Sequence, residues 1–324
     1  MKVSVCVVTY NHEMFISKCI DSILEQEADF EYEIIIAEDC SNDRTGEIVS
    51  RYAGEHQDKI TLISRLRNVG VMQNYEDVFR LAKGEYISFL DGDDYMLPGK
   101  LSAQVSALDE HQDCSISSHP LNNFDSKTGR ILSTPHKHEN IRFYTLEDMI
   151  LHGFFFSHSS KMFRKSSLPD EVVDKSTKNC TDYLLHMQNC LHGKVIHLNT
   201  VYGMHRVHSE SLSRHNMTKG NIRYALDDQI YAIEKISMYK EIDNSIITKG
   251  YVRVLLWGLR KAILACDFDE MYRIKALAKE KVPGYKFPII YRLICTSKLL
   301  VNITSRLYSY AYTSKNKLVT KTNV

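Results

Sequence analysis

The first 120 residues alternate short, apolar, β-branched runs with segments whose apolar residues recur every three or four positions. The runs expected to be strands cover residues 3–9, 32–37, 60–64 and 86–90. The segments expected to be helices between them cover residues 15–27, 45–53 and 72–82. Strands that are apolar on both faces and joined by helices are typical of a parallel sheet covered by helices on both sides. The pattern therefore predicts an open, doubly wound α/β sheet for this part of the chain.

Each predicted strand is followed by a polar segment. These segments are Thr9-Tyr10-Asn11, residues 38–43, residues 65–70 and Asp91-Gly92-Asp93-Asp94. In open α/β sheets, ligands bind outside the carboxyl ends of the strands. The four segments are therefore expected to form one binding rim.

Composition excludes several other classes of protein. The chain has 324 residues, and 41 Lys and Arg nearly cancel 40 Asp and Glu, so the net charge of +1 does not favour nucleic acid as a partner. The eight cysteines are scattered without a CxxC pair, which favours free thiols in a reducing cytoplasm over a zinc site or disulfides. No signal-peptide core is evident, and Arg292 and Lys298 interrupt the most apolar late stretch. We expect a cytoplasmic protein.

The second half of the chain divides into two further regions. Residues 121–215 are expected to complete the sheet and form an acceptor half, with strands at 157–163 and 195–202. The segment Gly153-Phe154-Phe155-Phe156 is interpreted as core, with an acceptor-site wall as the alternative. Residues 216–324 are expected to form a helical extension, with helices at 222–239, 245–266 and 270–281. The best boundary candidate is the linker at residues 209–219.

The four residues Asp91-Gly92-Asp93-Asp94 place three carboxylates directly after an apolar strand. Carboxylates this close repel each other unless a cation lies among them, and a hard divalent ion shared with substrate phosphates suits such oxygen ligands. The alternative is a solvated acidic turn that caps the segment before Pro98.

Taken together, four motifs resemble those of family 2 glycosyltransferases. They are Val5-Cys6-Val7-Val8-Thr9-Tyr10-Asn11, residues 34–45 with Glu38-Asp39-Cys40-Ser41-Asn42-Asp43, Asn68-Val69-Gly70, and residues 84–94 with Asp91-Gly92-Asp93-Asp94. The resemblance covers about residues 3–215. It implies a GT-A fold, which is a Rossmann-like mixed sheet with helices on both faces, followed here by the helical C-terminal subdomain. It also implies a nucleotide-sugar donor, a divalent metal (Mn²⁺ or Mg²⁺) and inversion at the anomeric carbon.

The resemblance assigns the donor-binding residues. Thr9, Tyr10 and Asn11 match the segment that holds the nucleoside, and Asp39 matches the carboxylate that accepts the uracil N–H, which favours a UDP-linked donor. The third loop, with Asn68 and Gly70, matches the segment whose small residue lets the backbone approach the nucleotide. The alternatives are a helix N-cap for Asn11, an Asx-turn for Asp39 and a plain turn for Asn68.

The resemblance also assigns metal and diphosphate ligands. In the acidic motif, Asp91 and Gly92 lie near the ribose and the metal, and Asp93 is the direct metal ligand. Asp94 supports the motif or caps the next segment. In Tyr202-Gly203-Met204-His205-Arg206-Val207-His208, His208 completes the metal site and Arg206 neutralises diphosphate charge by a bidentate contact.

Asp182 is the predicted general base. Asn179-Cys180-Thr181-Asp182 resembles the Glu-Asp motif that opens a helix facing the acceptor, with Thr181 in place of the usual Glu. Asp182 is then the sole carboxylate there. The alternative is an Asp that caps the helix.

Residues 281–324 hold eight Lys and Arg and no Asp or Glu, interleaved with aromatic residues. This composition suits an anionic membrane surface at the inner face of the cell, and the alternative is a solvated helix with a frayed tail. The sequence thus predicts an inverting, metal-dependent hexosyltransferase that moves a sugar from a UDP-sugar to a glycan or lipid-linked acceptor in bacterial surface polysaccharide assembly. Two rivals remain: a nucleotidyltransferase, and a non-catalytic nucleotide-sugar or glycan-binding scaffold.

Overall fold

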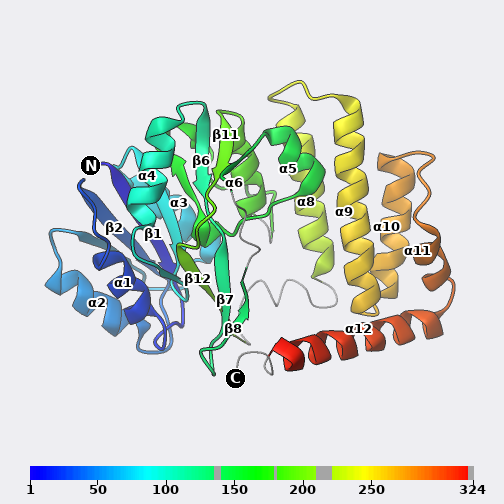
Figure 1. Ribbon diagram of the computed structural model, residues 1–324, viewed down its shortest axis with the longest axis horizontal. Helices are drawn as coiled ribbons and strands as arrows, with labels where there is room; N and C mark the ends of the chain where they lie inside the picture. Colours follow the sequence, from blue (N-terminus) through cyan, green and yellow to red (C-terminus); the bar gives the residue numbers. More distant parts are fainter. Residues whose placement is uncertain (135–139, 179–180, 209–220, 320–324) are drawn as a thin grey trace. The chain divides into compact units, whose positions relative to one another are not determined.

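The structure is a computed structural model that describes residues 1–134, 140–178, 181–208 and 221–319 (Figure 1). The chain forms two compact units. The first comprises Met1–Leu146, Phe154–Lys175 and Leu185–Val207, and the second comprises Glu147–Gly153, Ser176–Leu184 and His208–Val324. The predicted boundary at residue 215 and the predicted linker at residues 209–219 lie outside the described residues.

The first unit holds a large mixed sheet with the strand order β3-β2-β1-β4-β10-β6-β11-β9. The strands are β1 (Val3–Thr9), β2 (Tyr32–Glu38), β3 (Ile60–Ser64), β4 (Tyr86–Asp91), β6 (Cys114–Ser118), β9 (Arg142–Tyr144), β10 (Met162–Arg164) and β11 (Lys194–His197). Strands β1 to β4 are parallel, β10 is antiparallel to both β4 and β6, β11 is parallel to β6, and β9 is antiparallel to β11. Six strands therefore end at the same edge. The predicted GT-A sheet is confirmed.

A smaller sheet has the order β5-β12-β7-β8. Its strands are β5 (Tyr95–Met96), β7 (Leu121–Asp125), β8 (Ile131–Ser133) and β12 (Gly203–Val207). Strand β12 runs parallel to β7 and antiparallel to β5, which directly follows the acidic motif.

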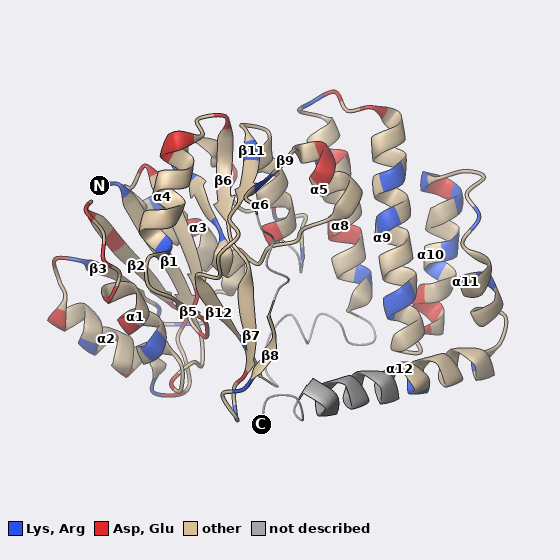
Figure 2. Ribbon diagram, viewed as in Figure 1, with Lys and Arg blue, Asp and Glu red and all other residues tan. Residues whose placement is uncertain are grey.

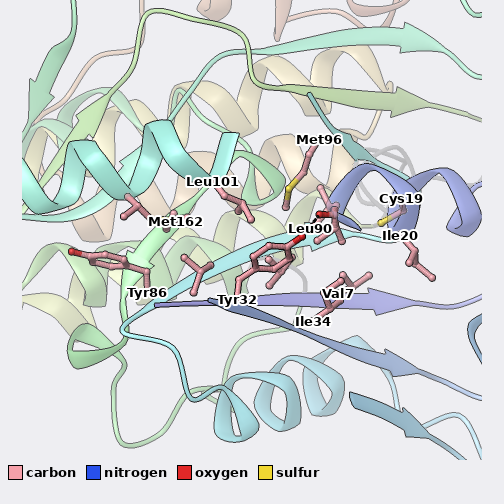
Figure 3. Packing of buried hydrophobic residues seen from close by; sticks show 14 of the residues in the cluster. Val7, Cys19, Ile20, Tyr32, Ile34, Tyr86, Leu90, Met96, Leu101 and Met162 are labelled. Atoms are coloured by element: carbon pink, nitrogen blue, oxygen red, sulfur yellow. Dashed lines mark hydrogen bonds between the residues drawn. The ribbon is translucent and has the colours of Figure 1, made fainter. Parts of the chain in front are cut away.

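Helices cover both faces of the large sheet. They are α1 (Ile16–Leu24), α2 (Thr45–Glu55), α3 (Val71–Leu81), α4 (Lys100–Glu110) and α6 (Thr181–Cys190). Helix α5 (Leu146–His152) belongs to the second unit apart from its first residue. Alternate residues of a strand face opposite sides of its sheet. Val3, Val5 and Val7 accordingly pack in one cluster with the apolar stripes of α1 and α4, shown in part in Figure 3. On the other face, the Cys6 thiol donates to the Val78 carbonyl of α3 at 3.5 Å.

Two strand predictions in the second half need correction. The segment predicted as a strand at 157–163 forms a 3₁₀ turn, η1 (His158–Ser160), followed by the short β10. The segment predicted at 195–202 ends early, because β11 stops at His197 and the chain then crosses to the second sheet, where β12 begins at Gly203.

In the described part of the second unit, the C-terminal region forms the helices α8 (Ile222–Ser237), α9 (Asn244–Leu264), α10 (Phe268–Lys281), α11 (Ile289–Ile294) and α12 (Lys298–Val319). Helices α8 and α9 pack closely at Gly258, where an added Cβ would lie 2.1 Å from Leu226 Cδ1. Arg253 on α9 donates to the Ile150 carbonyl of α5 at 3.0 Å and also bonds the Tyr183 hydroxyl. None of the helices in the described part of the chain is both long and apolar enough to cross a membrane.

Candidate functional site

The acidic motif forms a tight turn at the carboxyl end of β4. The Asp94 N–H donates to the Asp91 carbonyl at 3.0 Å, and the Gly92 N–H donates to the Val8 carbonyl at 3.0 Å. A Cβ at Gly92 would lie 2.7 Å from Thr9 Oγ1 and 3.0 Å from His12 Nδ1. Only glycine therefore lets the acidic turn lie against the turn that follows β1.

Asp91 is held by a residue far away in the sequence. Ser159 on η1 donates its hydroxyl to Asp91 Oδ2 at 3.0 Å, and the Asp91 N–H donates to the same hydroxyl at 3.2 Å. The Ser159 carbonyl accepts from the buried Lys100 ammonium at 2.7 Å. Ser159 and Lys100 were missed at the sequence level, since nothing in a serine-rich segment shows that it will be buried beside β4.

Asp94 is buried and links the acidic motif to β12. It is 1% exposed, and its Oδ1 accepts from the Arg206 N–H of β12 at 2.8 Å. Burial, aided by the neighbouring Asp93 charge, raises the pKa of Asp94 to about 8. Since the N-cap of α4 is Gly99, the alternative in which Asp94 caps that helix is wrong.

The Arg206 guanidinium lies between two aromatic rings, 4.4 Å from the Phe15 ring centre and 4.6 Å from that of Phe124. Its Nε donates to the Asp93 carbonyl at 2.7 Å. Arg206 thus fixes the backbone of the acidic turn. Its contact with a diphosphate stays a prediction.

The loops after β1 and β2 interlock. Asn11 adopts a left-handed conformation (φ 55°), its N–H donates to Ser41 Oγ at 2.9 Å, and its Oδ1 accepts from the Asn42 N–H at 2.9 Å. Asn42 also donates to the exposed Tyr10 hydroxyl at 3.1 Å, and Thr9 Oγ1 lies 3.2 Å from His12 Nδ1. The N-cap of α1 is Phe15, so the alternative in which Asn11 caps this helix is wrong.

Asp39 ties the second loop to the third. The carboxylate is buried, and its two oxygens accept from the Val69 N–H at 2.8 Å and the Gly70 N–H at 3.0 Å. Gly70 has a φ of 88° and precedes α3. Glu38, which the prediction did not single out, accepts instead from the N–H groups of the following turn, at Cys40 and Ser41. The Asx-turn alternative for Asp39 is therefore wrong.

The remaining predicted site residues occupy different surroundings. Asn68 is exposed on the third loop. Asp182 is half-buried in the first turn of α6, where its Oδ1 accepts from the Tyr183 N–H at 3.0 Å. His208 directly follows β12. Asp182 and His208 belong to the second unit and Asp93 to the first, so the roles of both residues stay predictions.

The acidic turn offers the hard carboxylate oxygens that Mg²⁺ and Mn²⁺ prefer. One of these oxygens, Asp94 Oδ2, is buried without a hydrogen-bond partner in the described part of the chain. Within the same residues, no three His, Cys, Asp or Glu side chains gather closely enough to hold an ion. The turn therefore fits a cation that takes further ligands from a bound diphosphate.

Comparisons with known proteins identify relatives of this chain. An uncharacterized protein of Mycobacterium tuberculosis (strain ATCC 25618 / H37Rv) is 29% identical over 210 residues, which are 64% of this chain and 60% of that protein's length. The poly(ribitol-phosphate) beta-N-acetylglucosaminyltransferase TarS of Staphylococcus aureus (strain Mu50 / ATCC 700699) is 34% identical over 121 residues, 34% of this chain and 19% of TarS.

Solved structures show the same fold. TarS 1–349 in complex with UDP-GlcNAc superimposes with a TM-score of 0.62 at 19% identity, covering 89% of this chain and 94% of that one. The mannosyltransferase PcManGT from Pyrobaculum calidifontis, in complex with GDP-Man and Mn²⁺, gives 0.56 at 16% identity, covering 98% and 86%. The family model described as glycosyl transferase family 2 matches residues 4–170, more than half of the chain. The chain therefore belongs to glycosyl transferase family 2.

Proposed function

We propose that this protein is an inverting, metal-dependent glycosyltransferase that moves a hexose from a UDP-linked donor to a hydroxyl group of a glycan or lipid-linked acceptor. The observation that carries the proposal is the rim itself, in which three interlocked loops and an acidic turn meet at the carboxyl ends of parallel strands. The relative TarS acts on poly(ribitol phosphate), and we propose bacterial surface polysaccharide assembly as the setting.

The donor's nucleoside would lie on the loops after β1, β2 and β3. A carboxylate has about four lone-pair positions, and the two backbone bonds to Asp39 leave further acceptor capacity for a base N–H. The contacts that we propose for the nucleoside are Thr9, Tyr10 and Asn11 after β1, and Asn68 and Gly70 on the third loop.

Asp93 would hold the divalent ion, with Asp91 beside it and His208 as a further ligand. The ion supplies positive charge that stabilises the departing diphosphate. Ser159 keeps the Asp91 carboxylate in one orientation, and Arg206 and Asp94 keep the turn rigid. Such preorganisation lets charged ligands act without rearrangement during the reaction.

Asp182 would accept the proton of the acceptor hydroxyl, which then attacks the anomeric carbon from the face opposite the nucleotide. The N-terminus of α6 stabilises the carboxylate, since the helix dipole is positive there. Thr181 occupies the position of a second family carboxylate. Because Thr181 is not a carboxylate, Asp182 would be the only residue of this motif that accepts the proton.

Turnover separates this proposal from the rival scaffold. The wild-type protein is incubated with UDP-glucose, UDP-GlcNAc or GDP-mannose and Mn²⁺, and nucleotide release is measured with and without an acceptor, either methyl β-D-glucopyranoside or poly(ribitol phosphate). We expect release of UDP that rises when the acceptor is present. Binding of nucleotide sugar without release would identify a scaffold, and pyrophosphate exchange with a sugar phosphate would identify a nucleotidyltransferase.

We further propose that residues 281–324 hold the protein at the inner, anionic face of the cell membrane. One side of α12 buries Val301, while Leu299, Ile303 and Leu307 are exposed at four-residue spacing, with Leu299 at 67%. Helix α11 likewise exposes Ile289, Ile290 and Leu293. Figure 2 shows no acidic residue on α11 or on the described part of α12. An apolar stripe flanked only by cations suits an anionic lipid surface.

A further inference from the structure

A pocket of about 460 Å³ lies at the carboxyl ends of β6 and β11 in the first unit. This volume falls within the range of about 300–1,000 Å³ that is usual for small-molecule sites. The side chains that define its chemistry are His119, Tyr144, Phe155, Ser157, His197 and His205. None of these residues was assigned to the donor rim described above.

One wall of the pocket is aromatic. The Phe155 and Tyr144 ring centres lie 4.0 Å apart, and the His197 ring meets Phe155 edge to face at 4.9 Å. Phe155 is 38% exposed although it belongs to this cluster of rings. An open aromatic ring favours a ligand with an apolar face, such as the C–H face of a sugar ring.

Three histidines supply the polar edges. His205 Nδ1 lies 2.8 Å from Asn123 Oδ1, His197 Nδ1 lies 2.9 Å from Ser118 Oγ, and His119 Nδ1 donates to the Pro120 carbonyl at 3.0 Å.

Burial, with the nearby Lys100 charge, holds the pKa of His119 well below its usual range, so the ring is neutral. Its Nε2 is then an acceptor, and this atom has no hydrogen-bond partner among the described residues. Because this atom is buried, a ligand hydroxyl could bond it only after the neighbouring side chains shift.

The charge of the side chains that line the pocket restricts the class of ligand. No Lys, Arg, Asp or Glu is among the ten described residues that line the pocket. A phosphate or carboxylate would lose its hydration there without gaining a countercharge, which is unfavourable. Rings for an apolar face and imidazoles for hydroxyl groups together favour an uncharged pyranose.

Two segments of the chain carry both pocket residues and residues that hold the acidic turn, although His205 and Arg206, as successive residues of β12, face opposite sides of the small sheet. Ser157 precedes by two residues the Ser159 that holds Asp91, and His205 directly precedes the Arg206 that bonds the Asp93 carbonyl. In the sheet, β6 and β11 lie on the opposite side of β4 from the strands that carry the nucleotide loops. Resting on the proposed function, we infer that the pocket binds the neutral sugar ring of the acceptor.

Ligand-observed NMR tests the inference directly. Methyl β-D-glucopyranoside and methyl N-acetyl-β-D-glucosaminide are titrated into the full-length protein, with glucose 6-phosphate as the charged comparison. We expect both glycosides to bind more tightly than the phosphate. Phe155→Ala should weaken them by about fivefold or more, the loss expected for one aromatic contact.

Phe143→Ala is the matched control, because Phe143 is the neighbouring exposed aromatic residue on β9 and does not line the pocket. Phe155→Leu, which keeps an apolar side chain without a π face, replaces the alanine variant if that variant does not fold. Equal effects at Phe143 and Phe155, or no effect at either, would overturn the assignment.

The affinity of the same variants for UDP-GlcNAc separates the acceptor from the donor's own sugar. We expect the Kd for UDP-GlcNAc to be the same in the wild type and in Phe155→Ala. A weaker donor complex in the variant would overturn the acceptor assignment, since the pocket would then hold the transferred sugar. A wild type that binds the glycosides but no nucleotide sugar would overturn the proposed function and leave only a sugar pocket.

Discussion

Two adjacent carboxylates of the acidic turn have different surroundings and are expected to respond differently to removal. Asp93→Ala should abolish the Mn²⁺-dependent part of UDP affinity with little change in the free energy of unfolding, since a rim carboxylate contributes little to the core. Asp94→Ala should instead destabilise the fold by about 1–3 kcal/mol, because it leaves the buried Arg206 N–H without an acceptor. Titration calorimetry and urea unfolding of both variants check this contrast, and a reversed pattern would contradict the assignment of the ligand to Asp93.

Asp182→Asn isolates the proposed base. The amide keeps the shape of the side chain but cannot accept the proton, so turnover should fall by about 10²-fold or more while the Kd for the donor is kept. Near-normal transfer by this variant would show that the base lies elsewhere. In the reverse direction, Thr181→Glu should raise the transfer rate if the missing family carboxylate limits this enzyme.

At the scale of elements, the contact between the turns after β1 and β4 depends on Gly92. Gly92→Ala should destabilise the protein by about 1–3 kcal/mol and weaken nucleotide binding, because the new Cβ would meet the Thr9 side chain at 2.7 Å. Gly54→Ala on α2 is the control, since nothing lies within 4 Å of its Cβ position, and it should stabilise the helix by about 0.5–1 kcal/mol. Equal stability of the two variants in chemical denaturation would refute the close contact.

The elements that the sequence predicts well are those whose burial is visible in a single run of residues. All seven residues of β1 and of β2 are buried, and this two-sided burial leaves runs that are apolar except at Ser4, Thr9, Glu33 and Glu38. The segment at 157–163 misleads because Ser159 and Ser160 are buried by partners on α4. A strand as short as β5, with two residues, has no readable period.

In the site too, the features that depend on a local run of residues can be predicted, and those that depend on distant residues cannot. The order of the polar loops along the chain identifies Asp39 and the acidic turn, because every loop follows a predicted strand. The partners of these residues are far away in sequence: Asp39 accepts from Val69 and Gly70, and Asp91 accepts from Ser159. Only the fold reveals them.

For the whole molecule, the membrane proposal predicts a salt-dependent association. Replacing the exposed cations Arg292, Lys298 and Arg306 by Ser should weaken binding to phosphatidylserine-containing vesicles by about 100-fold at low salt, since each cation near such a surface contributes about 1 kcal/mol. Changing Arg51, Lys83 and Arg130 of the first unit to Ser gives a control with the same net charge. Flotation of full-length protein with anionic and neutral vesicles measures both. Wild-type protein that ignores anionic vesicles at low ionic strength would leave α12 a structural helix only.

Metal-dependent binding of a nucleotide sugar is the central claim, and the thermal unfolding of the wild-type protein tests it most directly. UDP-glucose and UDP-GlcNAc are added with Mn²⁺ or with EDTA, and Asp93→Ala is scanned in parallel. A ligand at about 100 times its Kd stabilises the folded state by about 2.7 kcal/mol. We expect Tm to rise by several degrees with at least one UDP-sugar and Mn²⁺, by much less with EDTA, and by the same small amount in Asp93→Ala under both conditions. A wild-type Tm that neither UDP-sugar changes, or a rise that is equal with Mn²⁺ and EDTA, would contradict the account.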